Sequence, residues 1–353
     1  MIADIRLQNF RSYADASFEL GPSINIIVGP NASGKTNLLE ALLVLARGSS
    51  YRASDNELVA FNKPWARLDA HLSNNSLRTV KIIQKPQPAK SFEFDSKTLK
   101  RLNLDHTLPV VLFEPNHLSL LSGQPEIRRA YIDELLEQTV LGYSGLRREY
   151  RRALAQRNSL LKKGHPAQSQ LFPWNVRLSE LAGQVVRQRN ELVSTLNNKI
   201  GATYLDLAHG STKINLVYRA TWEAENYQSN LLKKLETSTE TDIWRGFTGS
   251  GPHREDLAVL FNNHPAQEAA SRGEARTLVL GLKILELEII KTNRGITPLL
   301  LMDDVFSELD GARRRALTNY LKPYQTFITT TDADVVVQNF TETCNILPIV
   351  KHY

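Results

Sequence analysis

The sequence predicts an α/β protein whose parallel sheet is assembled from the two ends of the chain, with a mainly helical insertion between them. Three observations carry this prediction. Near the N-terminus, an apolar run at 23–28 precedes a glycine-rich turn and a helical pattern at 37–47. Near the C-terminus, an apolar run at 298–302 ends in two aspartates. Between these ends, apolar residues recur at helical spacing from about 126 to 205.

Length and composition set broad limits. A chain of 353 residues is long enough for two or more domains. Lys and Arg number 43 against 37 Asp and Glu, a net charge of +6, which suits contact with nucleic acid as readily as it suits an ordinary soluble protein. One cysteine, Cys344, allows no disulfide within the chain, and no apolar stretch has the length of a membrane span. We therefore expect a cytoplasmic protein with no membrane partner.

The N-terminal third has the pattern of strands. Short runs that alternate apolar and polar residues occur at 2–9, 16–20, 67–72 and 79–83. The last two of these fit an antiparallel meander. Residues 109–113 are apolar throughout, as in strands that a parallel sheet buries on both faces. We place this run in the same sheet as the strand at 23–28.

The insertion has the pattern of long helices. One apolar stripe contains Leu178, Leu181, Val185, Leu192, Leu196 and Ile200. Gly164-His165-Pro166 predicts a turn between two antiparallel helices of about 35 residues each. Six consecutive residues, 147–152, include four arginines, and the positive charge continues to Arg157, Lys162 and Lys163. This basic helix is either a solvated face or a nucleic-acid contact surface, and both readings stay open.

The last part of the chain returns to an α/β pattern. Strands are expected at 213–221, 257–261, 298–302 and 326–328, and a long helix is expected at 274–291. A polar stretch at 236–242 predicts a loop.

The glycine-rich turn has the spacing of a P-loop, Gly29-Pro30-Asn31-Ala32-Ser33-Gly34-Lys35-Thr36. Successive backbone N–H groups of such a loop curl round a phosphate. Lys35 then reaches the outer phosphates, and the Thr36 hydroxyl is a ligand for Mg²⁺. The sequence thus predicts a site for ATP and Mg²⁺.

Asp303 and Asp304 stand at the carboxyl end of an apolar strand, where open α/β sheets bind their ligands. This is the Walker B arrangement. We expect Asp303 to bind Mg²⁺, directly or through water, and Asp304 to orient or deprotonate the water that attacks the γ-phosphate. Because Lys35 and Asp303 lie near opposite ends of the chain, the two ends must meet in one sheet.

Three further segments complete the order of an ABC-type ATPase. Ser271-Arg272-Gly273-Glu274 is a turn at a helix N-terminus, where a hydroxyl, free N–H groups and the helix dipole suit an anion. Ser307-Glu308-Leu309-Asp310 follows the aspartates, and Thr329-Thr330-Thr331-Asp332 follows the next strand.

The chain resembles the RecF family of bacterial recombinational-repair ATPases, which are relatives of the SMC proteins. The resemblance extends over nearly the whole chain and is carried by four distinctive segments: Leu7-Gln8-Asn9-Phe10-Arg11-Ser12-Tyr13, Gly123-Gln124-Pro125 with Arg128-Arg129 and Asp133, Gly251-Pro252-His253-Arg254-Glu255-Asp256-Leu257, and Leu300 to Asp310. It implies an ABC-type head, SMC-like, at 1–122 and 246–353, with a mainly helical insertion at 123–245.

The resemblance also implies a function. In that family two chains sandwich ATP, so Ser271 and Gly273 are assigned to the γ-phosphate of the other copy, and Ser307 to Asp310 to the seam between copies. Arg11, Ser12, Asn37 and Asp310 are further expected nucleotide-binding residues. The implied task is DNA repair, replication and recombination, including the SOS response. A homodimer clamps DNA at gaps or stalled forks and, with RecO and RecR, promotes RecA loading near the nucleoid.

The chain departs from the usual ABC pattern in three respects. The candidate base is Asp304, where Glu is typical, so slow ATP hydrolysis is expected, and the resemblance implies that DNA stimulates it. We find no glutamine with the pattern of a Q-loop and no switch histidine near Thr331. His253 is either a structural residue or a catalytic base. An SMC-like tether in which ATP only regulates assembly stays an alternative, whereas an ABC transporter subunit is disfavoured because its two motifs lie in one compact domain.

Overall fold

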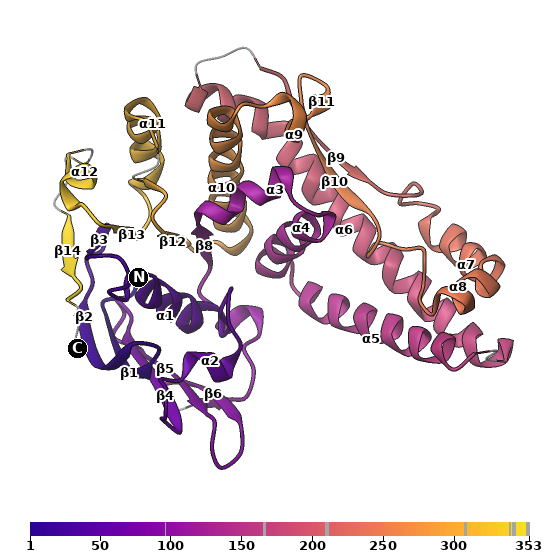
Figure 1. Cartoon of the computed structure of the whole chain (residues 1–353), viewed down its shortest axis with the longest axis horizontal. Coiled ribbons are helices and arrows are strands. Elements are labelled where there is room, and N and C mark those ends of the chain that lie inside the picture. Colours follow the sequence, from indigo (N-terminus) through magenta and orange to yellow (C-terminus); the bar gives the residue numbers. More distant parts are fainter. Residues whose placement is uncertain are drawn as a thin grey trace. The chain divides into compact units, whose positions relative to one another are not determined.

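The structure is a computed structural model of the chain, and it describes residues 1–95, 97–164, 167–208, 212–306, 309–338, 340 and 344–350. The chain divides into two compact units. Unit 1 contains residues 1–117 and 286–353, and unit 2 contains residues 118–285. Figure 1 shows the elements of each unit, coloured along the chain.

Unit 1 contains a five-stranded parallel sheet. Its order is β14 (Asn345–Pro348), β3 (Ile24–Val28), β13 (Thr326–Thr330), β12 (Leu299–Met302) and β8 (Val110–Phe113). The central strands β13 and β12 are buried along their whole length; β12 is apolar throughout, whereas β13 also buries three threonines. The structure confirms that β8 and β3 share one sheet and that strands from both chain ends build it.

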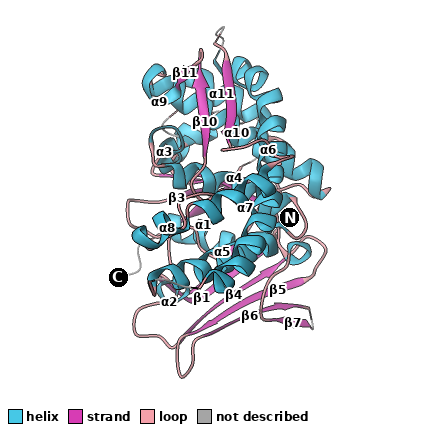
Figure 2. Cartoon of the chain, turned by 90° about the vertical axis from the view of Figure 1, so that its right-hand side faces the viewer, coloured by secondary structure: helices cyan, strands magenta, loops and turns pink. Residues whose placement is uncertain are grey.

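A second sheet of unit 1 has six antiparallel strands (Figure 2). Its order is β2 (Tyr13–Glu19), β1 (Asp4–Phe10), β4 (Trp65–His71), β5 (Leu77–Ile83), β6 (Ala89–Phe94) and β7 (Lys97–Leu99). The expected meander is therefore present, and it extends the N-terminal hairpin.

The helix α1 (Lys35–Arg47) forms the centre of unit 1. It is buried on nearly all sides and packs in one apolar cluster with residues of both sheets, including Leu7, Leu68 and Phe327. A helix that is apolar all round requires such a position. At its C-terminal end, Arg78 of β5 donates to the carbonyls of Leu45 (2.7 Å) and Ala46 (3.2 Å), and Gly48 takes the left-handed conformation at φ 80°. These contacts fix the C-terminal end of α1 against β5.

The remaining elements of unit 1 are short. They are α2 (Asp55–Leu58), η1 (Leu104–His106), η2 (Pro115–Leu118), α11 (Gly311–Leu321) and α12 (Ala333–Val337).

Unit 2 is mainly helical. Its helices are α3 (Ser119–Ser122), α4 (Pro125–Thr139), α5 (Tyr143–Lys162), α6 (Gln168–Ala208), α7 (Tyr227–Thr237), α8 (Thr239–Arg245) and α9 (Ala266–Ala269), and the division between the units falls within α10 (Arg272–Arg294). A small antiparallel sheet has the order β11 (His264–Pro265), β10 (Asp256–Phe261) and β9 (Ile214–Arg219). The stripe from Leu178 to Ile200 is buried, as its spacing predicts.

The compact units differ from the boundaries expected from the sequence. Residues 246–285 group with unit 2, although the sequence places them with the head. The reason is strand pairing: β10 pairs along its whole length with β9, from Asp256 opposite Arg219 to Phe261 opposite Ile214. A strand pattern alone does not say which partner strand it will find.

Two details of the insertion also differ. The prediction of a loop at 236–242 is wrong, because α7 and α8 cover this stretch. The hydroxyls of Thr237, Ser238 and Thr239 donate to the carbonyls of Lys233, Lys234 and Leu235, so these residues satisfy their polar groups within the helices. The two long helices are unequal, with 20 residues in α5 and 41 in α6. Of the expected turn, His165 and Pro166 lie outside the described residues.

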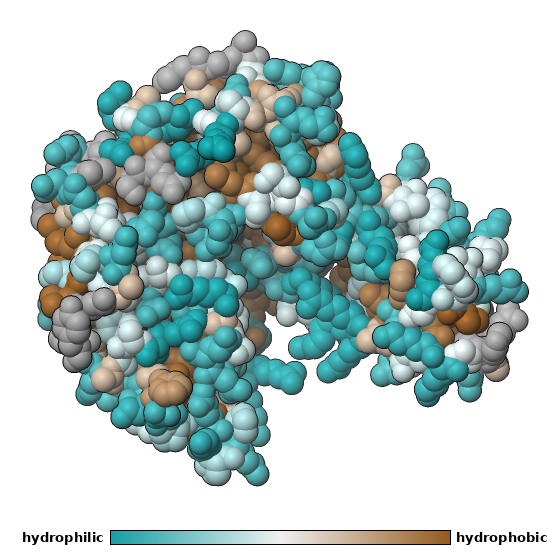
Figure 3. Space-filling view, viewed as in Figure 1, coloured by the Kyte–Doolittle hydropathy of each residue, from teal (hydrophilic) through white to brown (hydrophobic). Residues whose placement is uncertain are grey.

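The surface in view is mostly hydrophilic, and apolar residues form small separate patches on it (Figure 3). Within the described residues, no helix is both long enough and apolar enough to cross a membrane.

Candidate functional site

The P-loop connects β3 to α1 with a backbone that few residues other than glycine tolerate. Gly34 has φ 111° and is the N-cap of α1, and Ala32 has φ 61°. An added Cβ at Gly34 would lie 3.0 Å from the Ser12 hydroxyl and 3.1 Å from the Tyr13 hydroxyl. Tyr13 donates to the Gly34 carbonyl at 3.0 Å and so holds the loop. The N-terminus of α1 thus has the backbone form of a phosphate site.

Two polar groups of the loop fit an anionic ligand. Lys35 is 5% exposed, and its ammonium donates to the carbonyls of Gly29 (2.9 Å) and Pro30 (3.1 Å). Both carbonyl partners are neutral, so the buried charge gains from an anion. The buried hydroxyl of Ser33 has no hydrogen-bond partner among the described residues. A phosphate in the loop satisfies both groups.

The two ends of the chain meet between Thr36 and Asp303. The Thr36 hydroxyl donates to Asp303 Oδ1 at 3.0 Å, so the loop and the aspartate pair lie side by side as the sequence predicts. Mg²⁺ binds oxygen at about 2.1 Å in an octahedron, in which neighbouring ligands lie about 3.0 Å apart. The two oxygens therefore have the separation of two adjacent Mg²⁺ ligands.

The end of β8 adds a further acid. Because Phe113 lies opposite Met302, Glu114 follows beside Asp303 in the parallel pair. Burial raises the pKa of the Tyr51 hydroxyl. The carboxylates of Asp303 and Glu114 raise this pKa further. No cluster of three or more His, Cys, Asp or Glu with metal-ligand geometry occurs in the described part of the chain. The carboxyl edge of the parallel sheet therefore fits a cation that keeps phosphate and water among its ligands, as Mg²⁺ does.

Thr329 holds the aspartate pair; the sequence pattern places it in the segment Thr329 to Asp332 but assigns no role to Thr329 itself. Ile328 lies opposite Met302, so Thr329 follows beside Asp303 on the neighbouring strand. Its buried hydroxyl donates to Asp303 Oδ1 at 2.8 Å and accepts from the Asp304 backbone N–H at 2.8 Å. Asp304 has φ 53°, a left-handed conformation that this N–H contact helps to hold. A hydroxyl residue at the carboxyl end of the adjacent strand is the signal that marks it.

We expect Thr329→Val to lower the rate of ATP hydrolysis by about 10- to 100-fold, the usual effect of removing a partner of a metal ligand or catalytic group. The valine keeps the shape of the side chain, so nucleotide affinity measured without Mg²⁺ should stay unchanged. Thr329→Ser, which restores the hydroxyl, is the matched control and should recover most of the rate. Equal rates for the valine and serine variants would show that the hydroxyl has no part in hydrolysis.

Arg11 and Ser12 are held at the edge of the loop. The Arg11 guanidinium donates twice to the Glu40 carboxylate, at 2.7 and 2.9 Å. Asn37 donates to the Ser12 hydroxyl at 2.8 Å and accepts from Arg52 at 2.8 Å. The Arg11 charge is therefore balanced inside the protein.

Glu40 is a second residue that the sequence did not single out. It lies in the apolar pattern of α1, and its side chain is fully buried. Burial by itself raises its pKa, but hydrogen bonds from Arg11, Arg52 and Ser50 lower the pKa to about 2. The ionised carboxylate thus fixes the segments on both sides of α1.

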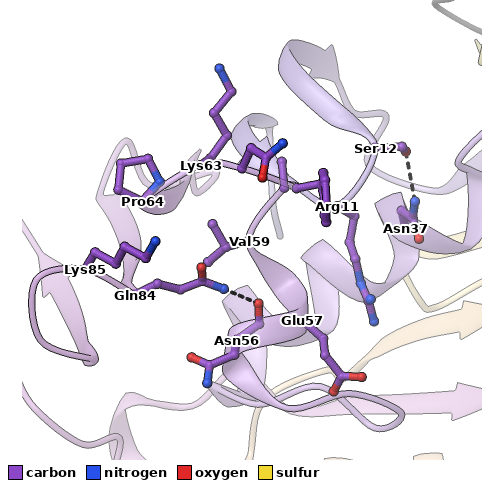
Figure 4. A pocket seen from close by; sticks show the side chains of 13 residues that line it. Arg11, Ser12, Asn37, Asn56, Glu57, Val59, Lys63, Pro64, Gln84 and Lys85 are labelled. Carbon is purple, nitrogen blue, oxygen red and sulfur yellow. Dashed lines mark hydrogen bonds between the residues drawn. The ribbon is translucent and has the colours of Figure 1, made fainter.

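A hollow of about 780 Å³ lies beside the start of α1. Figure 4 shows Ser12 and Asn37 at one side of it and Lys63, Gln84 and Lys85 at another. The Gln84 amide donates to the Asn56 carbonyl. Phe61, which also lines the hollow, is 92% exposed. The volume is within the range of small-molecule sites.

Ser271 and Gly273 belong to unit 2, whereas the P-loop belongs to unit 1. The Ser271 N–H donates to Glu274 Oε2 at 2.8 Å, and the Glu274 N–H donates to the Ser271 hydroxyl at 3.3 Å. This is a capping box at the start of α10. Ser271 is exposed, so its hydroxyl is accessible at the helix N-terminus.

Asp310 is the N-cap of α11 and accepts from the Arg313 N–H at 2.9 Å. That hydrogen bond lowers the pKa of the Asp310 carboxyl. The neighbouring Ser307 and Glu308 lie outside the described residues. Thr331 is exposed.

The distinctive segment at 251–257 forms an internal network of unit 2. Arg128 donates twice to Asp256 at 2.8 Å, and Arg129 donates to the Glu255 carbonyl at 2.6 Å. The buried Glu255 carboxylate accepts from the hydroxyls of Tyr218 and Tyr227, both at 2.7 Å. These residues hold α4, α7 and β9 against β10.

His253 belongs to the same network. Its Nε2 lies 3.1 Å from the Thr248 carbonyl, which can only accept, and its Nδ1 lies 2.6 Å from the Tyr150 hydroxyl. Burial lowers the pKa of His253 to about 4, so the ring is neutral at pH 7. With both ring nitrogens engaged inside unit 2, the geometry favours the structural reading over the catalytic one.

The parallel sheet, the P-loop before α1 and the aspartate pair beside it define an ABC-type ATPase head. Comparison with known proteins agrees. The family model described as the RecF/RecN/SMC N terminal domain matches residues 1–349. DNA replication and repair protein RecF of Lachnoclostridium phytofermentans is 33% identical over 99% of this chain and 98% of its own length. The Bacillus cytotoxicus protein of the same name is 33% identical over 94% of this chain and 92% of its own.

Solved structures agree as well. The recombination mediator protein RecF-ATPrS in the RecFOR pathway matches with a TM-score of 0.88 at 28% identity, over 98% of this chain and 96% of that one. An Smc head bound to the winged-helix domain of ScpA matches with a TM-score of 0.53 at 15% identity, over 96% of this chain and 92% of that one, which shows a shared fold. The chain belongs to the RecF family of DNA replication and repair proteins.

Proposed function

We propose that this chain is an ATP-dependent DNA-binding protein of recombinational repair that works as a homodimer. Two copies enclose ATP and clamp DNA at gaps or stalled forks, and slow, DNA-stimulated hydrolysis releases the clamp. With RecO- and RecR-type partners the clamp promotes RecA loading, in the cytoplasm near the nucleoid. Two comparisons support this task. The relatives are named DNA replication and repair protein RecF, and a similar solved structure is that of a recombination mediator in the RecFOR pathway.

The observation that carries the proposal is the 3.0 Å contact between Thr36 and Asp303. It joins a phosphate-binding loop to a carboxylate pair, which is the minimum needed for Mg-ATP hydrolysis. Gly29 to Gly34 offer backbone N–H groups to the phosphates, and Lys35 offers its charge. Thr36 and Asp303 are the Mg²⁺ ligands, and Ser12, Asn37 and the hollow of Figure 4 receive the nucleoside.

In the proposed mechanism Asp304 orients the attacking water and takes its proton. Mg²⁺ held by Thr36 and Asp303 would supply positive charge that offsets the charge of the phosphates. Thr329 fixes the backbone of Asp304, and Lys35 stabilises the developing charge on the phosphoryl oxygens. The aspartate side chain is one methylene shorter than the usual glutamate, which agrees with slow turnover.

The alternative is an SMC-like tether in which ATP regulates assembly alone. The longest helix in the described ranges, α6, has 41 residues and therefore spans about 60 Å at 1.5 Å per residue. This length is modest for a long-range tether, and the paired carboxylates fit hydrolysis.

The deciding experiment measures oligomeric state and duplex DNA affinity without nucleotide, with ATP and with ADP. We expect ATP, but not ADP, to produce a dimer and to raise the affinity for DNA. Lys35→Ala is the control that removes nucleotide binding and should behave as the nucleotide-free protein. A parental protein that stays monomeric with ATP, or binds DNA equally in all three states, refutes the clamp.

Ser271→Arg is expected to abolish ATP-dependent dimerisation while leaving ATP binding to the monomer unchanged. The reason is that the exposed turn at the start of α10 is assigned to the phosphate of the other copy, where a long side chain obstructs the approach. Light scattering with and without ATP measures dimerisation, and fluorescent nucleotide titration measures binding. Ser271→Thr keeps the N-cap and should dimerise normally. A dimerising arginine variant would remove Ser271 from the interface.

A further inference from the structure

The arginines of α5 divide into two groups. Arg147 and Arg157 face inward: Arg147 pairs with Glu137 at 2.8 Å, and Arg157 is 0% exposed. Arg148, Arg151 and Arg152 are exposed, and none has an acidic partner among the residues that the structure describes. The concentration of charge seen in the sequence thus combines an internal set with an external one.

The external set lines a shallow hollow of about 410 Å³, which is formed by Glu137, Ser144, Arg147, Arg148, Arg151, Arg152 and Ala155. The one acid of this hollow, Glu137, is already neutralised by Arg147. The other three guanidiniums keep their charge, so the hollow is strongly positive. Removing these three like charges from water is favourable only when a bound anion compensates them.

The spacing of these residues suits an extended polyanion. Ser144, Arg148, Arg151 and Ala155 follow one another at three- and four-residue steps along one face of α5, and Arg152, four residues after Arg148 and three before Ala155, borders the same face. Eleven helical steps from Ser144 to Ala155 span about 16 Å. A duplex carries one negative charge per about 1.7 Å of its axis, so a segment of this length presents several phosphates. Planar guanidiniums bind such phosphates with two hydrogen bonds each.

The composition of the hollow favours nucleic acid over an acidic protein. Its only apolar member is Ala155, whereas protein interfaces depend on buried aromatic or large apolar anchors. It also contains no Asn or Gln that reads base edges, so the contact is independent of sequence.

The scaffold beneath this face is rigid. Tyr143 donates to Asp133 at 2.7 Å, and Tyr150 is bound to His253 at 2.6 Å. Arg157 donates to Asp242 and Thr248, both at 2.8 Å. These buried contacts fix α5 along its length, so binding orders only the exposed side chains.

Six cations of the six-stranded sheet and its edge have explanations of their own. On the six-stranded sheet, Arg6, Arg67 and Lys81 are paired with Asp15, Asp69 and Glu93. Lys97, Lys100 and Arg101 are exposed beside β7, which is the edge strand of that sheet. Charged residues at a sheet edge commonly prevent pairing with another chain.

We propose that Arg148, Arg151 and Arg152 on α5 bind the phosphate backbone of duplex DNA, without regard to its sequence. The proposal rests on the DNA-binding function above and names the surface that performs it. The edge of the six-stranded sheet then has no share in the contact.

The test compares two triple variants with the same loss of charge. The first is Arg148→Gln, Arg151→Gln and Arg152→Gln, and the second is Lys97→Gln, Lys100→Gln and Arg101→Gln. Fluorescence anisotropy with a labelled duplex, over a range of salt concentrations and with ATP, gives the affinity and its salt dependence. Binding of a fluorescent ATP analogue verifies that each variant is folded.

The α5 variant is expected to bind the duplex at least about tenfold more weakly and to lower the slope of log K against log salt by about 2 to 3, since each phosphate contact contributes about 0.9. The β7 variant should match the parent. Equal losses in both variants, or a loss confined to the β7 variant, overturn the proposal. So does competition by poly-glutamate that equals that of duplex DNA per charge, which indicates an acidic protein partner instead.

The nucleotide-free state separates this inference from the clamp. If the parent binds DNA equally with and without ATP and the α5 variant does not bind, the surface is correct and the clamp is wrong. If ATP raises DNA affinity and the parent and the α5 variant bind with the same affinity, the clamp stands and the surface is wrong.

Discussion

Replacing Asp304 by asparagine is expected to leave ATP binding intact and to lower hydrolysis by about 100-fold or more, the range that general-base catalysis contributes. The amide keeps the size of the side chain but cannot take a proton from water. Asparagine also tolerates the left-handed backbone at φ 53°, so the change affects the chemistry rather than the backbone. With hydrolysis blocked, the proposed ATP dimer should persist.

Single-turnover phosphate release measures the rate, and light scattering after removal of free ATP measures dimer lifetime. Asp15→Asn is a matched control because Asp15 is exposed and pairs with Arg6 on the antiparallel sheet, so the rate should not change. An asparagine variant at position 304 that hydrolyses ATP at the parental rate would assign the base to another group.

Arg157→Ala is expected to destabilise unit 2 by about 3 to 5 kcal/mol, because it leaves a buried carboxylate without its partner. The guanidinium is fully buried and donates to Asp242 (2.8 Å), Thr248 (2.8 Å) and Asn175 (2.7 Å). Asp242 itself is 2% exposed, so water cannot replace the lost cation. Denaturant unfolding followed by circular dichroism measures the change.

Two variants control for this result. Arg148→Ala removes an exposed arginine from the same helix and should alter the free energy of unfolding by less than about 0.5 kcal/mol. Arg157→Met with Asp242→Leu removes both charges and should be more stable than Arg157→Ala alone. If Arg157→Ala unfolds like the parent, the ion pair does not hold the insertion together.

Much of the fold followed from periodicity. The strands at 24–28, 110–113 and 299–302 and the stripe on α6 are strongly apolar patterns, interrupted in these strands only by Asn25, and their burial is determined locally. Residues 236–242 show the opposite case, since their hydroxyls suit a loop or a helix equally and the surrounding packing selected the helix. The boundary near residue 246 depended on the pairing of β10 with β9, which no local pattern encodes.

The candidate site likewise combines residues that local patterns predict with residues whose roles depend on distant contacts. The spacing of Gly29, Gly34, Lys35 and Thr36 identified the phosphate loop because that chemistry is local. The role of Thr329 was not predicted, although its segment was recognised, and Glu40 was not found, since each acts through residues that are distant along the chain. His253 stood in a distinctive segment, yet its contacts with Tyr150 and Thr248 give it a structural role.

The sequence by itself determined the class of protein, the loop, the aspartate pair and the need for both chain ends to meet, because each depends on residue types at short spacing. The tertiary structure alone decided that Thr36 and Asp303 lie 3.0 Å apart, that Thr329 holds both aspartates, and which arginines of α5 face solvent. Strand register and burial set these relations. They arise when distant segments pack together, so no stretch of the sequence contains them.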